Sequence, residues 1–171
     1  MQATVAPHYR IRILAIDPGS QISGFACLAC QAAGNCRPEH MDILEVGVAR
    51  FNKNQSFTGK IGDAFELASK LIATYQPTHC SIEKAFYGEN ISTAMKLGEI
   101  RGAFIAAFEQ AKLPITQITP AEVKKHITGN GRATKQDVAF AVSKILKADL
   151  GDLPFDAADA LAIALSCAMR I

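Results

Sequence analysis

The chain has 171 residues, of which 49% are apolar and 20% charged, and its formal net charge is +2. This length and composition are typical of one ordinary globular domain and exclude a protein that is strongly basic throughout. No run of about 18 apolar residues is present, so a membrane-spanning helix is not expected. Residues 1–10 lack the apolar segment of a secretory signal. We therefore expect a flexible extension over 1–10 and a single domain over 11–171.

The first part of the chain predicts three antiparallel strands. Residues 11–17 are apolar nearly throughout, which is typical of a central strand buried on both faces. Residues 21–28 and 41–51 predict two further strands, and the loop over 29–40 joins them.

Cys27, Cys30, Cys36 and His40 lie in or beside that loop. Their spacing resembles a zinc ribbon, but an insertion at a hairpin tip with incidental thiols is the favoured interpretation. The five cysteines form no regular framework, and we expect a reduced, cytoplasmic protein.

The rest of the chain predicts alternating helices and strands. They are a helix over 58–75, a strand over 79–83, a helix over 90–111 and a strand over 115–118. Three helices follow: one that Thr119 caps and that ends near Gly129, one that Thr134 caps and that runs to about Leu146, and the last over 155–169. The expected fold is therefore α/β, with a mixed five-stranded sheet (three antiparallel strands followed by parallel ones) flanked by helices. Small residues in the 90–111 helix suit either ordinary core packing or a subunit interface.

Four acids stand at informative positions. Asp17 ends the first strand and Glu83 ends the fourth. In open α/β sheets, functional sites are found at these carboxyl ends of the strands. Asp156 and Asp159 lie in the first turn of the last helix, where positions i and i+3 share a face. The simpler explanation of this last pair is helix capping, with Asp156 as the N-cap. If all four acids converge, their mutual repulsion favours oxygen-bound divalent cations, Mg²⁺ or Mn²⁺, rather than zinc.

Basic residues gather in one segment. Residues 121–147 contain six Lys or Arg and two acids, a local charge of +4 against −2 for the rest. A basic flank beside an acidic pocket suits a polyphosphate substrate, although a solvated helix surface also explains any single lysine.

Four segments of the chain form a set of motifs: Ile16-Asp17-Pro18-Gly19-Ser20 with Gly24, Ile82-Glu83-Lys84-Ala85-Phe86, Lys96-Leu97-Gly98 with Arg101-Gly102, and Asp156-Ala157-Ala158-Asp159 with the apolar run after it. Together they resemble the motifs of RuvC, the bacterial Holliday-junction resolvase family. The order and spacing match from residue 11 to 169. The cysteine-containing loop and the ten leading residues depart from the family pattern without touching the acids.

The resemblance implies an RNase H-like fold and a homodimer that resolves four-way DNA junctions by paired symmetric nicks, in recombination and repair. It implies catalytic, metal-binding acids at Asp17, Glu83, Asp156 and Asp159, which hold two Mg²⁺, with Mn²⁺ able to substitute. It also implies a partner complex of RuvA with RuvB. The DNA-binding residues that we expect are Phe86, Lys124, Lys125, Arg132 and Lys135. A core position is the alternative for Phe86.

Three other functions remain to be compared. An aspartate-glycine turn after a first strand also opens actin-like ATPases, which need a second such domain. A nuclease of the same fold that acts on RNA or other branched DNA is a second alternative. The third is a junction-binding module without activity, which the presence of all four acids disfavours.

Overall fold

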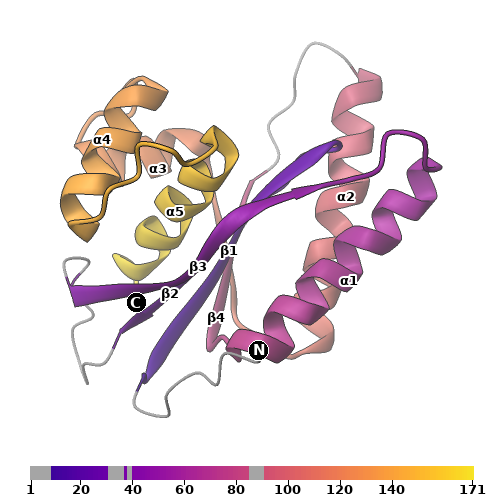
Figure 1. Ribbon diagram of the computed structural model, residues 1–171, viewed down its shortest axis with the longest axis horizontal. Helices are drawn as coiled ribbons and strands as arrows, with labels where there is room; N and C mark the ends of the chain where they lie inside the picture. Colours follow the sequence, from indigo (N-terminus) through magenta and orange to yellow (C-terminus); the bar gives the residue numbers. More distant parts are fainter. Residues whose placement is uncertain (1–8, 31–36, 38–39, 85–90) are drawn as a thin grey trace.

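The computed structural model describes residues 9–30, 37, 40–84 and 91–171 (Figure 1). Its centre is a five-stranded mixed sheet with the strand order β3-β2-β1-β4-β5. The strands are β1 Ile11–Asp17, β2 Ile22–Cys30, β3 Met41–Arg50, β4 His79–Glu83 and β5 Ile115–Ile118. The first three pair antiparallel, and β4 and β5 join β1 in parallel. The predicted α/β class, with its mixed sheet and central first strand, is confirmed.

Helices cover both faces of this sheet (Figure 1). On one face lie α1 Phe57–Tyr75 and α2 Ile91–Gln110; on the other lie α3 Pro120–Thr128, α4 Lys135–Leu146 and α5 Phe155–Ala168. No helix in this part of the chain is both long enough and apolar enough to cross a bilayer.

The central strand β1 is buried on both faces, as its sequence predicts. Ile13 and Ala15 belong to the core under α5, while Leu14 and Ile16 belong to the core under α1 and α2. This alternation follows from the two-residue period of a strand. The last residue of β1, Asp17, therefore points to the α5 side.

Most predicted element bounds agree with the structure to within two residues. The alternative that Asp156 caps the last helix is wrong. The N-cap of α5 is Pro154, and no side chain caps this helix. Asp156 therefore lies inside the first turn, where its carboxylate is not used by the helix end.

The cysteines that the structure describes do not form a zinc site. Cys27 is a free thiol in the core under α1 and α2, whereas Cys30 lies in the opposite core. Positions three apart on a strand face opposite ways, which separates the two sulfurs. Cys30 is also disulfide-bonded, so the expectation of a fully reduced protein is wrong at this residue, which ends β2 beside the loop. Cys36 lies outside the described residues.

Candidate active site

Two of the four acids are brought together by strand pairing. The parallel register pairs Ile16 of β1 with Ile82 of β4, so Asp17 and Glu83 follow at the same end of adjacent strands. Both isoleucines pack in the core under α1 and α2. The next residue on each strand faces the other way, toward the side that α5 covers.

The other two acids reach this edge of the sheet on α5, and Gly24 permits the approach. Gly24 is the antiparallel partner of Asp17. A β-carbon at Gly24 would lie 1.9 Å from the carbonyl oxygen of Asp156, so only glycine lets the α5 backbone come this close to β2. The contact places the first turn of α5 directly beside the end of β1.

The turn after Asp17 is held by a buried hydroxyl. The Oγ atom of Ser23 accepts a hydrogen bond from the Gly19 N–H at 3.0 Å and donates one to the Gly19 carbonyl at 3.1 Å. Ser23 has no exposed surface. The serine therefore fixes the path of the chain immediately after the first acid.

Three of the acids and two lysines line a single pocket of about 270 Å³. They are Asp17, Glu83, Asp159, Lys124 and Lys135. The Nζ atom of Lys135, at the start of α4, lies 2.7 Å from Oδ2 of Asp159. The pocket therefore combines a cluster of anions with cations that the basic 121–147 segment supplies.

The acids in this pocket strongly influence one another. Burial, followed by repulsion from Glu83, Asp159 and Asp156, raises the pKa of Asp17 to about 8, and Lys135 opposes the rise. Burial and Asp159 likewise raise the pKa of Glu83. The hydrogen bond to Asp159 raises the pKa of Lys135. Such crowding of buried carboxylates is unfavourable unless a counter-charge is bound.

The donor set suits a hard cation. Carboxylate oxygens are the ligands that Mg²⁺ prefers, and no thiol or imidazole lines the pocket. Among the described residues, however, no group of three or more acid, histidine or cysteine side chains is already gathered closely enough to hold an ion. Asp159 is paired with Lys135, and Asp156 interacts with Asp17 electrostatically without lining the pocket.

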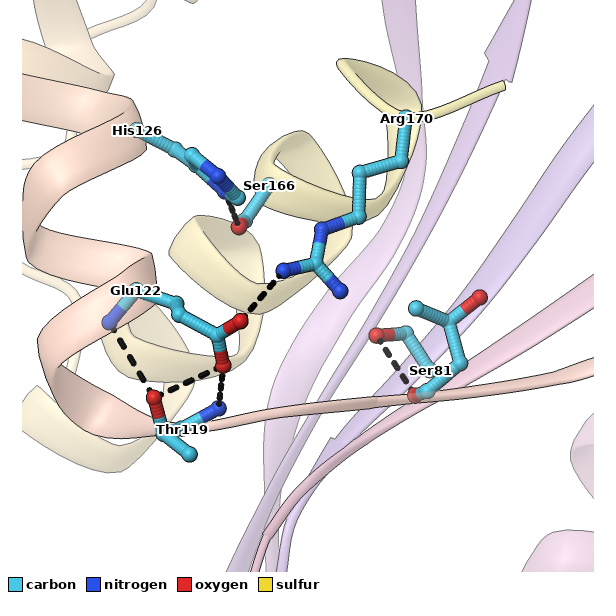
Figure 2. Close-up of polar contacts among 7 residues, drawn as sticks. Ser81, Thr119, Glu122, His126, Ser166 and Arg170 are labelled. Atoms are coloured by element: carbon cyan, nitrogen blue, oxygen red, sulfur yellow. Dashed lines mark hydrogen bonds and ion pairs between the residues drawn. The ribbon is translucent and has the colours of Figure 1, made fainter.

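A polar cluster joins α3 to the far end of α5 (Figure 2). Glu122 accepts hydrogen bonds from the N–H and hydroxyl of Thr119 at 2.8 and 2.7 Å, and Arg170 binds its other oxygen at 2.7 Å. One turn further along α3, Nδ1 of His126 lies 2.5 Å from Oγ of the buried Ser166. These contacts lie on either side of Lys124 in sequence and hold the helix that carries it.

A second polar contact holds the end of β4. The Nε atom of Arg101, on α2, donates to the Glu83 carbonyl at 2.9 Å, and its guanidinium also binds Gln117 of β5 at 2.5 Å. Ser81 of β4 donates to the Thr116 carbonyl of β5 (Figure 2). Arg101 thus fixes the backbone of an acid that it does not neutralise.

The remaining predicted site residues are not in the pocket. Lys125 and Arg132 are exposed and do not line it. Phe86 lies outside the described residues. Sequence reasoning gave Gly24 and Arg101 no structural role, and it placed Lys135 on the phosphate without foreseeing its ion pair with Asp159. The glycine inside a strand pattern was the available signal, since such a residue often marks a close backbone approach.

Comparison with known families identifies the chain. The sequence profile described as "Crossover junction endodeoxyribonuclease RuvC" matches residues 13–167. The chain belongs to the RuvC family. Relatives of that name include the protein of Chlorobium phaeovibrioides, 37% identical over 92% of this chain and 81% of its own length. The protein of Heliobacterium modesticaldum is 36% identical over 91% of this chain and 93% of its own length.

Solved structures agree with this family. The chain is similar to Thermus thermophilus RuvC in complex with a Holliday junction substrate, with a TM-score of 0.85, 26% identity and 94% of each chain covered. It shares its fold with the yeast mitochondrial Holliday junction resolvase Ydc2, with a TM-score of 0.67, 14% identity and coverage of 97% of this chain and 80% of the yeast protein. The RNase H-like fold expected from the sequence is thus confirmed.

The raised pKa of Asp17 predicts an unusual pH dependence of stability without metal. A carboxyl whose pKa rises from 3.8 when unfolded to about 8 when folded keeps its proton longer in the native state. Stability therefore falls as pH rises between these values. At pH 7.5 in EDTA, Asp17→Asn should melt a few degrees above the wild-type chain. For a chain of this length, each kcal/mol of added unfolding free energy raises the melting temperature by about 2–4 °C. At pH 4 the two melting temperatures should converge. A lower melting temperature for the variant at pH 7.5 would contradict this account.

Proposed function

We propose that this chain resolves four-way DNA junctions by hydrolysing one phosphodiester bond in each of two opposed strands, in recombination and repair. The observation that carries the proposal is the pocket in which Asp17, Glu83 and Asp159 meet two lysines, in a chain of the RuvC family. Asp156, one turn from Asp159, completes the proposed catalytic and metal-binding set. The relative solved with a Holliday junction supports the substrate.

Metal dependence follows from the family, and we propose two Mg²⁺ per site, replaceable by Mn²⁺, held by Asp17, Glu83, Asp156 and Asp159. Bound there, the ions would supply an activated water and stabilise the leaving oxygen. Asp17 is repelled by all three other acids, and bound cations would relieve that repulsion. Lys135, which pairs with Asp159 and lines the pocket, would contact the scissile phosphate. No protein nucleophile is needed.

The DNA contacts that we propose come from the basic segment of α3 and α4. Lys124 and Lys135 enter the pocket, and Lys125 and Arg132 lie exposed nearby in sequence, where they would neutralise phosphates of the junction arms. Phe86 is proposed, on the family resemblance alone, to stack on a base near the junction centre.

Lys124→Ala should weaken junction binding and reduce its salt dependence. Each phosphate contact contributes about 0.9 to the slope of log K against log salt, so the loss of one contact lowers the slope by about that amount. Fluorescence anisotropy with a labelled junction at several salt concentrations measures this. Lys53→Ala, at an exposed position before α1, is the control and should leave the slope unchanged. An unaltered slope for Lys124→Ala removes this lysine from the interface.

We also propose that the chain acts as a homodimer, with α2 at the interface. Ile91 and Met95, in the first half of α2, are 76% and 62% exposed. A β-carbon added at Gly98 or Gly102 would meet nothing within 4 Å, so this helix surface is open to a second helix. Two protomers with identical sites suit paired cuts in opposed strands.

Met95→Glu should weaken dimerisation by about 2 kcal/mol or more, because it buries a charge in an apolar contact. Sedimentation over a concentration series measures the dissociation constant. Ile171→Glu, at an exposed C-terminal position, is the matched control. A variant that sediments as the wild-type dimer, or a wild-type chain that is monomeric at all concentrations, contradicts the assigned interface.

The proposal has three further parts. The chain cooperates with a RuvA-RuvB complex, it acts in the cytoplasm, and it consists of a single nuclease domain over 11–171 behind an extension over 1–10. The direct test is incubation of a synthetic four-way junction with and without Mg²⁺, mapping the cuts on all strands. Symmetric, Mg²⁺-dependent cuts are expected. Preference for duplex DNA or RNA over the junction in competition would favour a nuclease of another specificity.

A further inference from the structure

A second and larger hollow lies between α4, the connection after it and the start of α5. Its volume is about 850 Å³, within the range of ligand-binding clefts. Figure 1 shows the connection returning beside α4 to the start of α5. We call this hollow the α4–α5 groove and define it by Phe140, Lys144, Lys147, Leu150, Phe155 and Ala158.

Two exposed aromatic rings belong to the α4–α5 groove. Phe140 and Phe155 are 65% and 63% exposed, and they are the exposed phenylalanines among the described residues. Exposed aromatic area is unfavourable in water, and two such rings in one concave site indicate a ligand with flat apolar faces. The Nζ atom of Lys144 lies over the ring of Phe140, 5.3 Å from its centre, and the residue is 65% exposed even with this contact.

The charge of the groove is positive. Lys144 and Lys147 line it, and Asp149 is the acid among its lining residues. Asp149 keeps its charge while its Oδ1 atom accepts a hydrogen bond from the Gly151 N–H at 3.0 Å, so two lysines and one aspartate give the lining a charge of +1. A ligand of complementary charge is therefore anionic.

The α4–α5 groove and the acid pocket are built on the same two helices but share no lining residue. On α4, Lys135 and Val138 line the acid pocket, while Ala139 and Phe140 line the groove. On α5, Asp159 lines the pocket and its neighbour Ala158 lines the groove. Since neighbouring helix positions point about 100° apart, the groove is a separate contact surface on a different side of these helices.

We propose that the α4–α5 groove binds unpaired nucleotides of a junction strand. Bases stack on Phe140 and Phe155, and the adjoining phosphates lie near Lys144 and Lys147, the combination typical of single-strand binding sites. The inference rests on the proposed function and adds to it a site that favours strands frayed at the crossover. A polyanion with aromatic faces matches both the charge and the exposed rings, whereas an apolar protein segment would leave the lysines unpaired.

The absence of tryptophan from the chain permits a direct test. Phe140→Trp and Phe155→Trp each introduce a single indole in the groove, and Met169→Trp, at a 41% exposed site, is the control. The probe is a single-stranded oligothymidine of about ten nucleotides, titrated in EDTA to prevent cleavage. Quenching of the two groove indoles, with the control unchanged, is expected because a stacked base quenches indole emission. Equal quenching at all three positions, or none in the groove, overturns the inference.

Affinity gives the second measurement. The Phe140→Ala, Phe155→Ala double variant should bind this oligonucleotide at least about fivefold more weakly, the loss of one stacked base. Its melting temperature should stay near that of the wild-type chain, because both rings are exposed. Affinity within twofold of wild type overturns the inference and leaves the groove to a protein partner. If the wild-type chain cuts junctions normally in that case, the groove assignment fails while the proposed function stands.

Discussion

Asp17→Asn is expected to abolish cleavage of a synthetic four-way junction while leaving junction binding intact. The substitution preserves the size of the side chain but removes the charge that is coupled to all three other acids. Loss of a proposed metal ligand should remove several kcal/mol of transition-state stabilisation, or about 10³-fold or more in rate. The lysines proposed to bind phosphate are unchanged, so affinity in EDTA should stay within a few-fold of wild type.

Single-turnover cleavage with Mg²⁺ and a binding titration without it separate these two effects. Asp63→Asn, on the exposed surface of α1, is the matched control and should cut at the wild-type rate. If Asp17→Asn still cuts at near the wild-type rate, the acid pocket is not the catalytic centre. A melting curve tells loss of catalysis from loss of folding. At pH 7.5 in EDTA the Asp17→Asn variant is expected to melt above the wild-type chain, so an unfolded variant would be recognised at once.

Gly24→Ala is expected to be the most damaging conservative change outside the acids. Its new methyl group would lie 1.9 Å from the Asp156 carbonyl oxygen, a backbone atom that can move only if the first turn of α5 moves. Overpacking of this kind costs about 1–3 kcal/mol. Displacement of that turn also shifts Asp156 and Asp159 away from Asp17, so Mg²⁺-dependent cleavage should fall by about 10²-fold or more, as for small misplacements of catalytic groups.

Urea unfolding and the Mg²⁺ concentration needed for half-maximal cleavage measure the two consequences. Gly62→Ala is the control, because a β-carbon there meets nothing within 4 Å on an exposed helix position. It should be neutral or stabilise the protein by up to about 1 kcal/mol. A Gly24→Ala chain that behaves like this control would show that the close approach of α5 to β2 is not required.

Strands and helix starts can be predicted from local sequence patterns. The apolar run of 11–17 predicted a central strand, because a strand buried on both faces is apolar at nearly every position. The Thr119 and Thr134 caps predicted the starts of α3 and α4, since a capping box needs only residues three apart. The capping interpretation of Asp156 was wrong, because Pro154 occupies the N-cap position and the helix begins at Phe155.

The sequence by itself determined the order of the elements and the acids that end β1 and β4, because strand period, helix caps and strand ends depend on neighbouring residues. Only the tertiary structure decided that Lys135 pairs with Asp159, that Gly24 admits the α5 backbone and that Phe140 and Phe155 share a groove. These contacts join residues far apart in the chain. Their existence depends on how closely the helices pack on the sheet, and no local pattern of residues specifies that distance.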